Sequence, residues 1–332
     1  MTILIWITAF LTVLSAGASP GRAEETDLVP IRFAVILSVG QGEIPTTIKQ
    51  FGLDKKYGMD AQVVDFAVPG QQFNMLRSGA ADIASGNFTD LLRQRKAGVA
   101  IQAFHSSRRY SNVVVTRPTS PIKTLTDLKG KKLGEFGPTA LDWLILRAAA
   151  IKAYGIDLQK DTAELVAGAP PLLNQLLAKD AIDAALQFDP MTLAPLMNGQ
   201  QRLITTIPTV MKDAGFEPAS FYLQWQITEA WTKAHPGMID KLYRMIDEAY
   251  AKLKTDDDLW PALAKQVNIT DPKLIAAYRE DARKYENPPY RKSYLQSTQK
   301  LLDAIIAVAG EQSVGVTKVD PDAFLFPAGS GT

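Results

Sequence analysis

The chain contains an internal repeat, and this repeat restricts its possible folds more than any other feature of the sequence. Residues 76–84 (LRSGAADIA) match residues 177–185 (LAKDAIDAA) at an offset of 101, with a leucine and an aspartate in common. The same offset places Pro69 on Pro170. A repeat of this length indicates a structural unit that occurs twice, so we expect two similar halves.

Each copy alternates predicted strands and helices. The pairs Tyr57-Gly58 and Tyr154-Gly155 each follow a predicted helix, and glycine suits a helix end because it adopts the left-handed conformation without a Cβ clash. Alternating strands and helices predict an α/β fold in which each half is a mainly parallel sheet with helices on both faces. From residue 228 onward the pattern becomes mainly helical, which predicts a helical C-terminal extension.

The predicted elements follow from apolar runs and turn residues. We expect strands at 31–37, 63–66, 83–85, 99–105, 112–116, 132–135, 163–166 and 184–187. We expect helices at 45–57, 71–78, 89–97, 140–154, 172–179, 229–235, 238–254, 257–267, 272–286 and 290–308.

The amino terminus predicts an exported protein. Residues 3–14 are uninterruptedly apolar, too short a run for a helix across a bilayer but suited to a signal peptide, although no Lys or Arg precedes them. Small residues follow, and we expect a signal peptide at 1–23 with cleavage after Ala23 rather than after Ala18. A buried first helix and a membrane anchor are the alternatives.

Composition argues against several classes of function. The chain has no cysteine and only two histidines, His105 and His235, which argues against disulfides, thiol nucleophiles, Cys or His zinc sites and a cysteine-linked lipid. The 36 Lys and Arg residues balance 35 Asp and Glu residues, so no basic field attracts nucleic acid. We therefore expect no catalytic residue, no metal, no cofactor and no nucleic-acid partner.

The repeat also predicts where a ligand binds. In open α/β sheets, ligands bind beyond the carboxyl ends of the strands, so two facing halves would line one cleft with the loops 38–43, 85–88, 137–142 and 186–189. With Trp225, which follows the second half, the candidate ligand-binding residues are Ser38, Gln41, Asn87, Phe88, Thr139, Asp142, Gln187, Phe188, Asp189 and Trp225.

Most of these residues have a structural alternative. Gln41 and Asn87 would either hydrogen-bond a ligand or brace their own loops. Phe88 and Phe188 would either enclose a flat ligand or pack in the core. Trp225 would supply a further aromatic wall or pack at the hinge.

Thr139 and Asp142 stand at the start of the predicted helix 140–154. Thr139 is expected to be its N-cap, and the free N–H groups of the first turn could then receive an anionic group. A carboxylate such as Asp142 is favoured in a first turn by the helix dipole whether or not a ligand is present.

The charges of the loops indicate a class of solute. They contain Glu43, Asp142 and Asp189 but no Lys or Arg, which favours an amine-bearing, zwitterionic or amidine-like solute over an anion. The segment 105–109 follows another predicted strand and would add positive charge at the rim of the cleft.

Several segments together resemble periplasmic substrate-binding proteins of ABC importers, in the group for nitrate, sulfonates, taurine and thiamine-precursor pyrimidines. They are 120–134 (SPIKTLTDLKGKKLG), the two repeated motifs, the Asp189-Pro190 pair and the His235-Pro236 pair, and the similarity runs from about 31 to about 255. Many relatives have Glu or Trp-Glu before this proline, where this chain has Phe188-Asp189, so its ligand need not be the ligand of a relative.

The resemblance implies a two-lobed periplasmic binding protein of type II. Lobe 1 would comprise 30–116 and 222–332, lobe 2 would comprise 117–221, and the crossovers would lie near 116–119 and 206–221. It implies a periplasmic monomer that closes on a small polar or zwitterionic solute and docks onto a permease. There are two alternatives. One is an enzyme of thiamine-pyrimidine biosynthesis with the same fold, which uses a Cys-rich motif and a histidine, and the other is a ligand-binding partner of a sensor.

Overall fold

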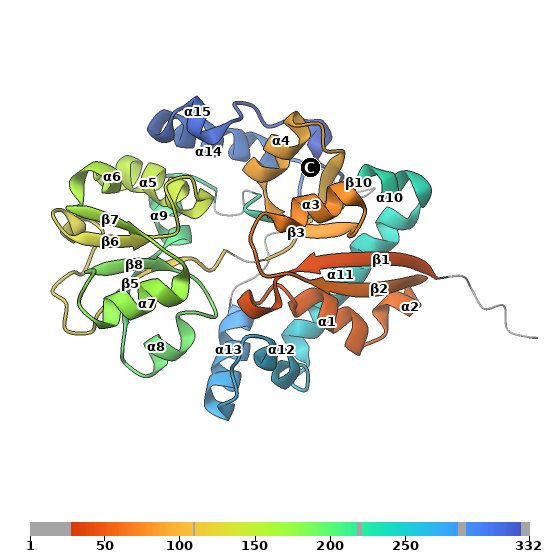
Figure 1. The fold of residues 1–332 in the computed structure, drawn as a ribbon, viewed down its shortest axis with the longest axis horizontal. Coiled ribbons are helices and arrows are strands. Elements are labelled where there is room, and N and C mark those ends of the chain that lie inside the picture. Colours follow the sequence, from red (N-terminus) through yellow and green to blue (C-terminus); the bar gives the residue numbers. More distant parts are fainter. Residues whose placement is uncertain (1–27, 109, 218–220, 285–289, 327–332) are drawn as a thin grey trace, which may run out of the picture.

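The computed structural model describes residues 28–108, 110–217, 221–284 and 290–326. The predicted signal peptide at 1–23 and Arg109 lie outside these residues. The described chain forms two lobes, each built on one five-stranded sheet (Figure 1). Within the described residues, no helix is long and apolar enough to cross a membrane.

The two sheets have the same strand order. The first is β2(Met59–Asp65), β1(Val29–Val35), β3(Ile83–Asn87), β10(Leu223–Thr228) and β4(Ile101–Ser106). The second is β7(Glu164–Ala167), β6(Lys132–Glu135), β8(Ala184–Gln187), β5(Val113–Thr116) and β9(Arg202–Thr206). In each sheet the fourth strand, β10 or β5, is antiparallel to both neighbours. The predicted duplication and the α/β fold are therefore confirmed.

The aspartate shared by the repeats has the same structural role in both lobes. Asp82 Oδ2 accepts the backbone N–H of Arg32 at 2.9 Å, and Asp183 Oδ2 accepts that of Lys132 at 2.8 Å. The backbone N–H of each aspartate donates in turn to the carbonyl of the same partner, at 3.0 and 2.9 Å. Each aspartate therefore ties the start of a central strand to the strand beside it, and the repeated motif stabilises the fold rather than contacting a ligand.

The Tyr-Gly pairs end helices as expected. Gly58 has φ 77° after α2(Leu53–Lys56), and Gly155 has φ 69° at the C-cap of α5(Leu141–Tyr154). The single helix expected at 45–57 is wrong, because Gly52 adopts φ 60° and separates α1(Glu43–Gln50) from α2.

Helices cover both faces of the first sheet (Figure 1). On one face lie α1, α2, α11(Met238–Thr255) and α12(Trp260–Gln266), which share a core with β1 and β2. On the other lie α3(Gln71–Ser78) and α4(Phe88–Lys96), and α10(Glu229–Ala234) follows β10.

The second sheet is covered in the same way (Figure 1). One face carries α5, α6(Leu158–Asp161) and α9(Ile207–Asp213), and the other carries α7(Pro170–Ala178) and α8(Leu193–Met197). Sequence patterns did not predict β9, β10, α6, α8 or α9, and they placed the start of β2 four residues too late. Met59 in fact pairs with Val29 directly after Gly58.

The C-terminal segment contacts both lobes. After α13(Pro272–Lys284), α14(Tyr294–Ala309) packs against α5 of the second lobe. The chain then passes α15(Glu311–Val314) and returns to the first lobe, where Leu325 N donates to Ala103 O at 2.7 Å. One apolar core cluster therefore continues from α4 through α14 to α5.

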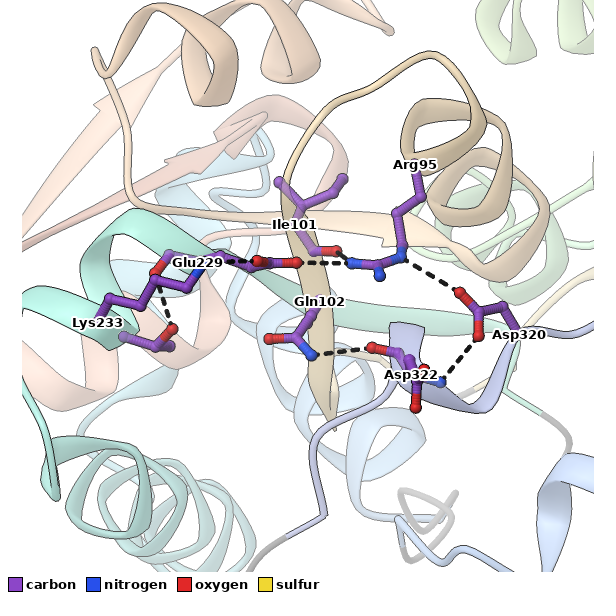
Figure 2. A network of polar contacts seen from close by, with 8 residues as sticks. Arg95, Ile101, Gln102, Glu229, Lys233, Asp320 and Asp322 are labelled. Carbon is purple, nitrogen blue, oxygen red and sulfur yellow. Dashed lines mark hydrogen bonds and ion pairs between the residues drawn. The ribbon is translucent and has the colours of Figure 1, made fainter.

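Polar contacts fasten the end of this segment to the first lobe (Figure 2). Arg95 Nη1 donates to Ile101 O at 2.7 Å and to Glu229 Oε1 at 3.0 Å, and its Nε lies 3.7 Å from Asp320 Oδ2. Gln102 Nε2 donates to Asp322 O at 2.9 Å. These contacts join α4, β4, α10 and the chain after α15.

Candidate functional site

A pocket of about 160 Å³ lies between the two lobes. The first lobe contributes the loop after β1, the second contributes the start of α5 and the loop after β8, and both connections between the lobes pass through the wall. The lining residues are Val39, Gln41, Arg108, Ser111, Asn112, Asp142, Phe188, Tyr222 and Leu223. Two larger cavities do not lie between the lobes. One is lined by α4 and the C-terminal segment, and the other, beside Tyr154, is lined by the second lobe alone.

Arg108 joins the ligand-facing loops of the two lobes. Its Nη1 donates to Val39 O of the first lobe at 2.8 Å, and its Nη2 donates to Asp189 O of the second. The guanidinium carbon lies 5.7 Å from the centre of the Phe188 ring, a cation–π distance. The positive charge expected from segment 105–109 therefore reaches the pocket through Arg108.

Asp142 supplies the negative charge of the pocket. It stands in the first turn of α5, and its Oδ1 accepts a hydrogen bond from the Tyr222 hydroxyl. Burial raises the pKa of Asp142 to about 6, while the Tyr222 hydroxyl, the Asn112 amide and the Arg108 charge act in the opposite direction. A carboxyl with this pKa changes its charge close to neutral pH.

Two stacked tyrosines form the wall behind Asp142. The rings of Tyr110 and Tyr222 lie 3.8 Å apart between centres and 28° from parallel. Burial, together with the charge of Asp142, raises the pKa of both phenols well above 10, so both stay protonated at neutral pH. The Tyr222 hydroxyl also lies 3.2 Å from Asn112 Oδ1.

Three of the ten sequence-predicted residues line this pocket: Gln41, Asp142 and Phe188. Gln41 also braces its own loop, because its Oε1 accepts the N–H of Ile36 at 2.9 Å. Phe188 is half-buried and meets Phe136 edge to face at 5.6 Å.

Phe88 and Trp225 lie in the core and not at the pocket. Phe88 is fully buried on α4, and Trp225 on β10 is 1% exposed with its ring edge to face against Phe33 at 5.6 Å. Neither ring is therefore placed to enclose a ligand as the sequence suggested. Their apolar surface is buried against the first sheet from opposite sides.

Asn87, Thr139 and Ser38 lie outside the pocket lining. Asn87 is the N-cap of α4, and its Oδ1 accepts the N–H of Asp90 at 2.8 Å. Thr139 is exposed, and the prediction that it is the N-cap of α5 is wrong. The helix begins one residue later than expected, so Ala140 is the N-cap and makes no side-chain hydrogen bond there. Ser38 is exposed on a 3₁₀ turn.

Gln187 and Asp189 support the loop after β8. The fully buried Gln187 donates from Nε2 to Pro170 O at 2.9 Å and to Asn174 Oδ1 at 3.1 Å. Asp189 Oδ1 accepts the hydroxyl of Thr192 at 3.0 Å. Both side chains are buried, and the second reaches the site through its carbonyl, which binds Arg108.

Sequence reasoning missed Asn112, Tyr222 and their neighbours. They stand just before β5 and β10, the antiparallel strand of each sheet, where the chain has just crossed from the other lobe. The first crossover, expected near 116–119, is wrong, because β5 already pairs in the second sheet and the chain therefore crosses before Val113. Only the correct position of this crossover would have indicated that Asn112 lies between the lobes. Within the described residues, no group of three His, Cys, Asp or Glu side chains is arranged to bind a metal.

Comparisons with known proteins agree with this architecture. Residues 49–258 match the model of the family described as NMT1/THI5 like. A search among curated proteins found no match. The periplasmic aliphatic sulphonate binding protein SsuA from Escherichia coli is similar in structure, with a TM-score of 0.71, 20% identity and coverage of 89% of this chain and 96% of that one.

Two further solved structures show the range of proteins with this fold. The alkanesulfonate-binding protein SsuA from Xanthomonas axonopodis pv. citri, bound to MOPS, has a TM-score of 0.70 and 16% identity, and the match covers 90% of this chain and 99% of that one. The desulfurization enzyme DSZB has a TM-score of 0.60 and 13% identity, with coverage of 89% and 95%. The fold therefore occurs in binding proteins and in an enzyme.

Proposed function

Because the chain belongs to the NMT1/THI5-like family, we propose that it is the solute-binding component of an ABC importer, which captures a small organic solute between its lobes and delivers it to a permease. The observation that carries this proposal is the pocket whose wall is shared by both lobes and both crossovers. A solute there contacts both lobes at once, so its binding energy favours the closed arrangement.

The size and polarity of the pocket support a compact, polar solute. Its volume of about 160 Å³ is close to that of a cavity of roughly 150 Å³ that accommodates benzene. The lining combines aromatic rings with one cation and one carboxyl, which suits a polar or zwitterionic molecule of sulfonate, taurine or pyrimidine type. We propose that Gln41, Asp142, Phe188, Arg108 and Tyr222 contact it.

The remaining parts of the proposal concern location and partners. We propose that residues 1–23 direct export and are removed, and that the mature protein is a periplasmic monomer. Lobe 1 would comprise residues 30–112 and 222–332, and lobe 2 would comprise residues 113–221, because β5(Val113–Thr116), which the sequence assigned to lobe 1, pairs within the second sheet. The proteins similar in structure include a periplasmic sulphonate-binding protein, which supports this assignment.

A ligand screen tests the proposal. Thermal shift is measured with taurine, alkanesulfonates, nitrate, aminopyrimidines and aromatic acids, since a solute at 100 times its Kd stabilises a protein by about 2.7 kcal/mol. Mass spectrometry of the solute after incubation should recover it unchanged, because we propose binding without chemistry. A chemically altered solute would instead favour an enzyme with this fold.

Two matched variants locate the binding site. Phe188→Ala should weaken binding of the best solute at least tenfold, because the ring lines the pocket. Phe51→Ala serves as the control, because Phe51 is also half-buried beneath a cation, Lys252 Nζ at 4.8 Å, but lies outside the pocket lining. Equal affinities of the two variants would place the solute elsewhere.

A further inference from the structure

Two pairs of helices join the lobes outside the pocket (Figure 1). In one pair, α14 packs against α5 as part of the apolar core cluster that continues from α4. In the other pair, α13 of the first lobe meets α8 of the second. Figure 1 shows these two pairs at opposite sides of the molecule. The lobes can therefore separate around a solute only if one of the two connections breaks.

Helix α13 is fixed to the first lobe. Its Tyr278 is buried, with the hydroxyl donating to Glu43 Oε1 of α1 at 2.7 Å. The ring of Tyr278 meets Trp260 of α12 edge to face at 5.4 Å. Farther along the helix, Arg279 Nη1 lies 2.9 Å from Asp257 Oδ2, just before α12. Because these contacts reach α1 and α12, α13 moves with the first lobe.

Leu193, at the start of α8, is fixed to the second lobe. Asn174 Nδ2 of α7 donates to Met191 O at 3.0 Å, two residues before this leucine. The Thr192 hydroxyl donates to Asp189 Oδ1 at 3.0 Å. These contacts hold the segment 189–193 against α7 and the end of β8, so the backbone of Leu193 moves with the second lobe.

The side chain of Leu193 nevertheless lies in the core of the first lobe. It is 8% exposed and belongs to the apolar cluster of β1, α1, α11, α12 and Tyr278. Among the described residues, it is the one member of this cluster that comes from the second lobe. The neighbouring Pro190 leaves no room for a side chain at Gly40 of the first lobe, where a Cβ would lie 3.8 Å from Pro190 Cδ and 3.2 Å from the Tyr278 hydroxyl.

We propose that Leu193 is a latch, which holds the lobes together without solute and must withdraw from the first lobe to admit or release one. Opening between α14 and α5 would disrupt a core with many buried members from both lobes, whereas opening at α8 exposes a single leucine to water. Leu193 lies outside the pocket lining, so it acts on opening without touching the solute. This inference rests on the proposed function for the role of the solute, but the latch can be measured without one.

Thiol labelling measures how often the latch opens, because the chain has no cysteine. Leu193→Cys places a thiol at the latch, Met197→Cys places one at an exposed position of the same helix, and Leu173→Cys places one in the core of the second lobe. Without solute, we expect the thiol of Leu193→Cys to react with a maleimide more than tenfold more slowly than that of Met197→Cys. It should react more than tenfold faster than that of Leu173→Cys, because exposure of Leu173 requires unfolding of the lobe.

A labelling rate of Leu193→Cys within tenfold of either control overturns the inference. A rate close to that of Met197→Cys would show that Leu193 is exposed in solution and holds nothing together. A rate close to that of Leu173→Cys would show that Leu193 belongs to a core that does not open in the folded protein.

The release of solute tests the functional part of the inference. In Leu193→Ala, the best solute of the ligand screen should dissociate about tenfold faster in stopped-flow measurements, because closure buries less apolar surface. Leu196→Ala is the matched control, since Leu196 is half-buried on the same helix but packs against the apolar cluster within the second lobe. It should leave the dissociation rate unchanged.

The outcomes separate this inference from the proposed function. A wild-type dissociation rate in Leu193→Ala, or an equal increase in Leu196→Ala, overturns the latch while the proposed function survives, because a solute still binds. If no compound of the screen binds, the proposed function fails, and the labelling rates alone decide whether Leu193 holds the lobes together.

Discussion

Replacing Arg108 with methionine tests whether one side chain holds the two lobes together around the pocket. Arg108 is the residue whose guanidinium donates to a carbonyl of each lobe, at Val39 and at Asp189. Methionine keeps an unbranched apolar stem of similar length but removes the charge and every donor. The variant therefore removes the link between lobes with little change in packing.

The expected magnitude follows from the contacts that reach the second lobe. A hydrogen bond from a charged donor contributes about 1.5–3 kcal/mol, and the half-exposed position of Arg108 favours the lower end. The contact with the Phe188 ring adds about 0.5 kcal/mol. A loss of about 2 kcal/mol lowers the ratio of closed to open molecules roughly thirtyfold.

The absence of cysteine makes the measurement straightforward. Cysteines introduced at Ser78 and Lys179, which are exposed and occupy equivalent positions in the two repeats, carry dyes for single-molecule energy transfer between the lobes. Arg108→Met should broaden the distance distribution and lengthen its mean without ligand. Arg202→Met is the matched control, because Arg202 also donates to two carbonyls, Ser120 O and Ile122 O, but within one lobe.

A distance distribution of Arg108→Met identical to that of the wild type would refute the reasoning. The closed arrangement would then depend on the apolar and helical contacts between the lobes, such as those of α14 with α5 and of α13 with α8. An equal effect of Arg202→Met would show that loss of any half-buried guanidinium, rather than of a contact between the lobes, opens the molecule.

Three further predictions concern stability, each measured by chemical denaturation. Trp225→Ala should lower the free energy of unfolding by about 4 kcal/mol, because it empties a fully packed core position; a loss below about 1 kcal/mol would contradict the packing described. Asp82→Ala and Asp183→Ala should each cost about 1–3 kcal/mol, the former more because the ion pair of Asp82 with Arg32, at 2.8 Å, is shorter than that of Asp183 with Arg117, at 3.9 Å; a neutral result for both would contradict the structural role of the motif. The Arg147 guanidinium lowers the pKa of Asp157, so Asp157→Asn should lower the free energy of unfolding by about 2 kcal/mol near pH 7. This difference between variant and wild type should shrink as the pH falls below about 4, because the wild-type carboxyl is then protonated. A difference that persists at pH 2 would argue against an ionic origin.

Local patterns predicted the architecture because they act within one element or one repeat. Gly58 and Gly155 end helices through a backbone conformation that glycine adopts with little strain, and the repeated aspartates brace equivalent strands. The strand at Ala184–Gln187 and the helix at Gln71–Ser78 have the predicted bounds. Alternating strands and helices, repeated once, then leave few arrangements other than two sheets covered on both faces.

The candidate site was only partly predictable for a related reason. Asp142 and Phe188 follow strands within a repeat, so the rule about strand ends located them. Phe88 follows a strand in the same way, yet its ring turns into the core, and no pattern of five or six residues distinguishes these two outcomes. Threonine is a residue type favoured at N-caps, which is why Thr139 was predicted to be one, but α5 begins after Ala140.

The order of the amino acids was sufficient for the duplicated α/β unit, the helical C-terminal extension and the absence of cysteine chemistry, because each depends on residue type and short-range spacing. Tertiary structure alone decided which residues face the pocket. Asn112 and Tyr222 are 110 residues apart, and they meet because β5 and β10 each cross into the other lobe and enter its sheet beside the central strands. Contacts of this kind depend on how whole sheets pair, and a local pattern carries no information about a partner on another strand.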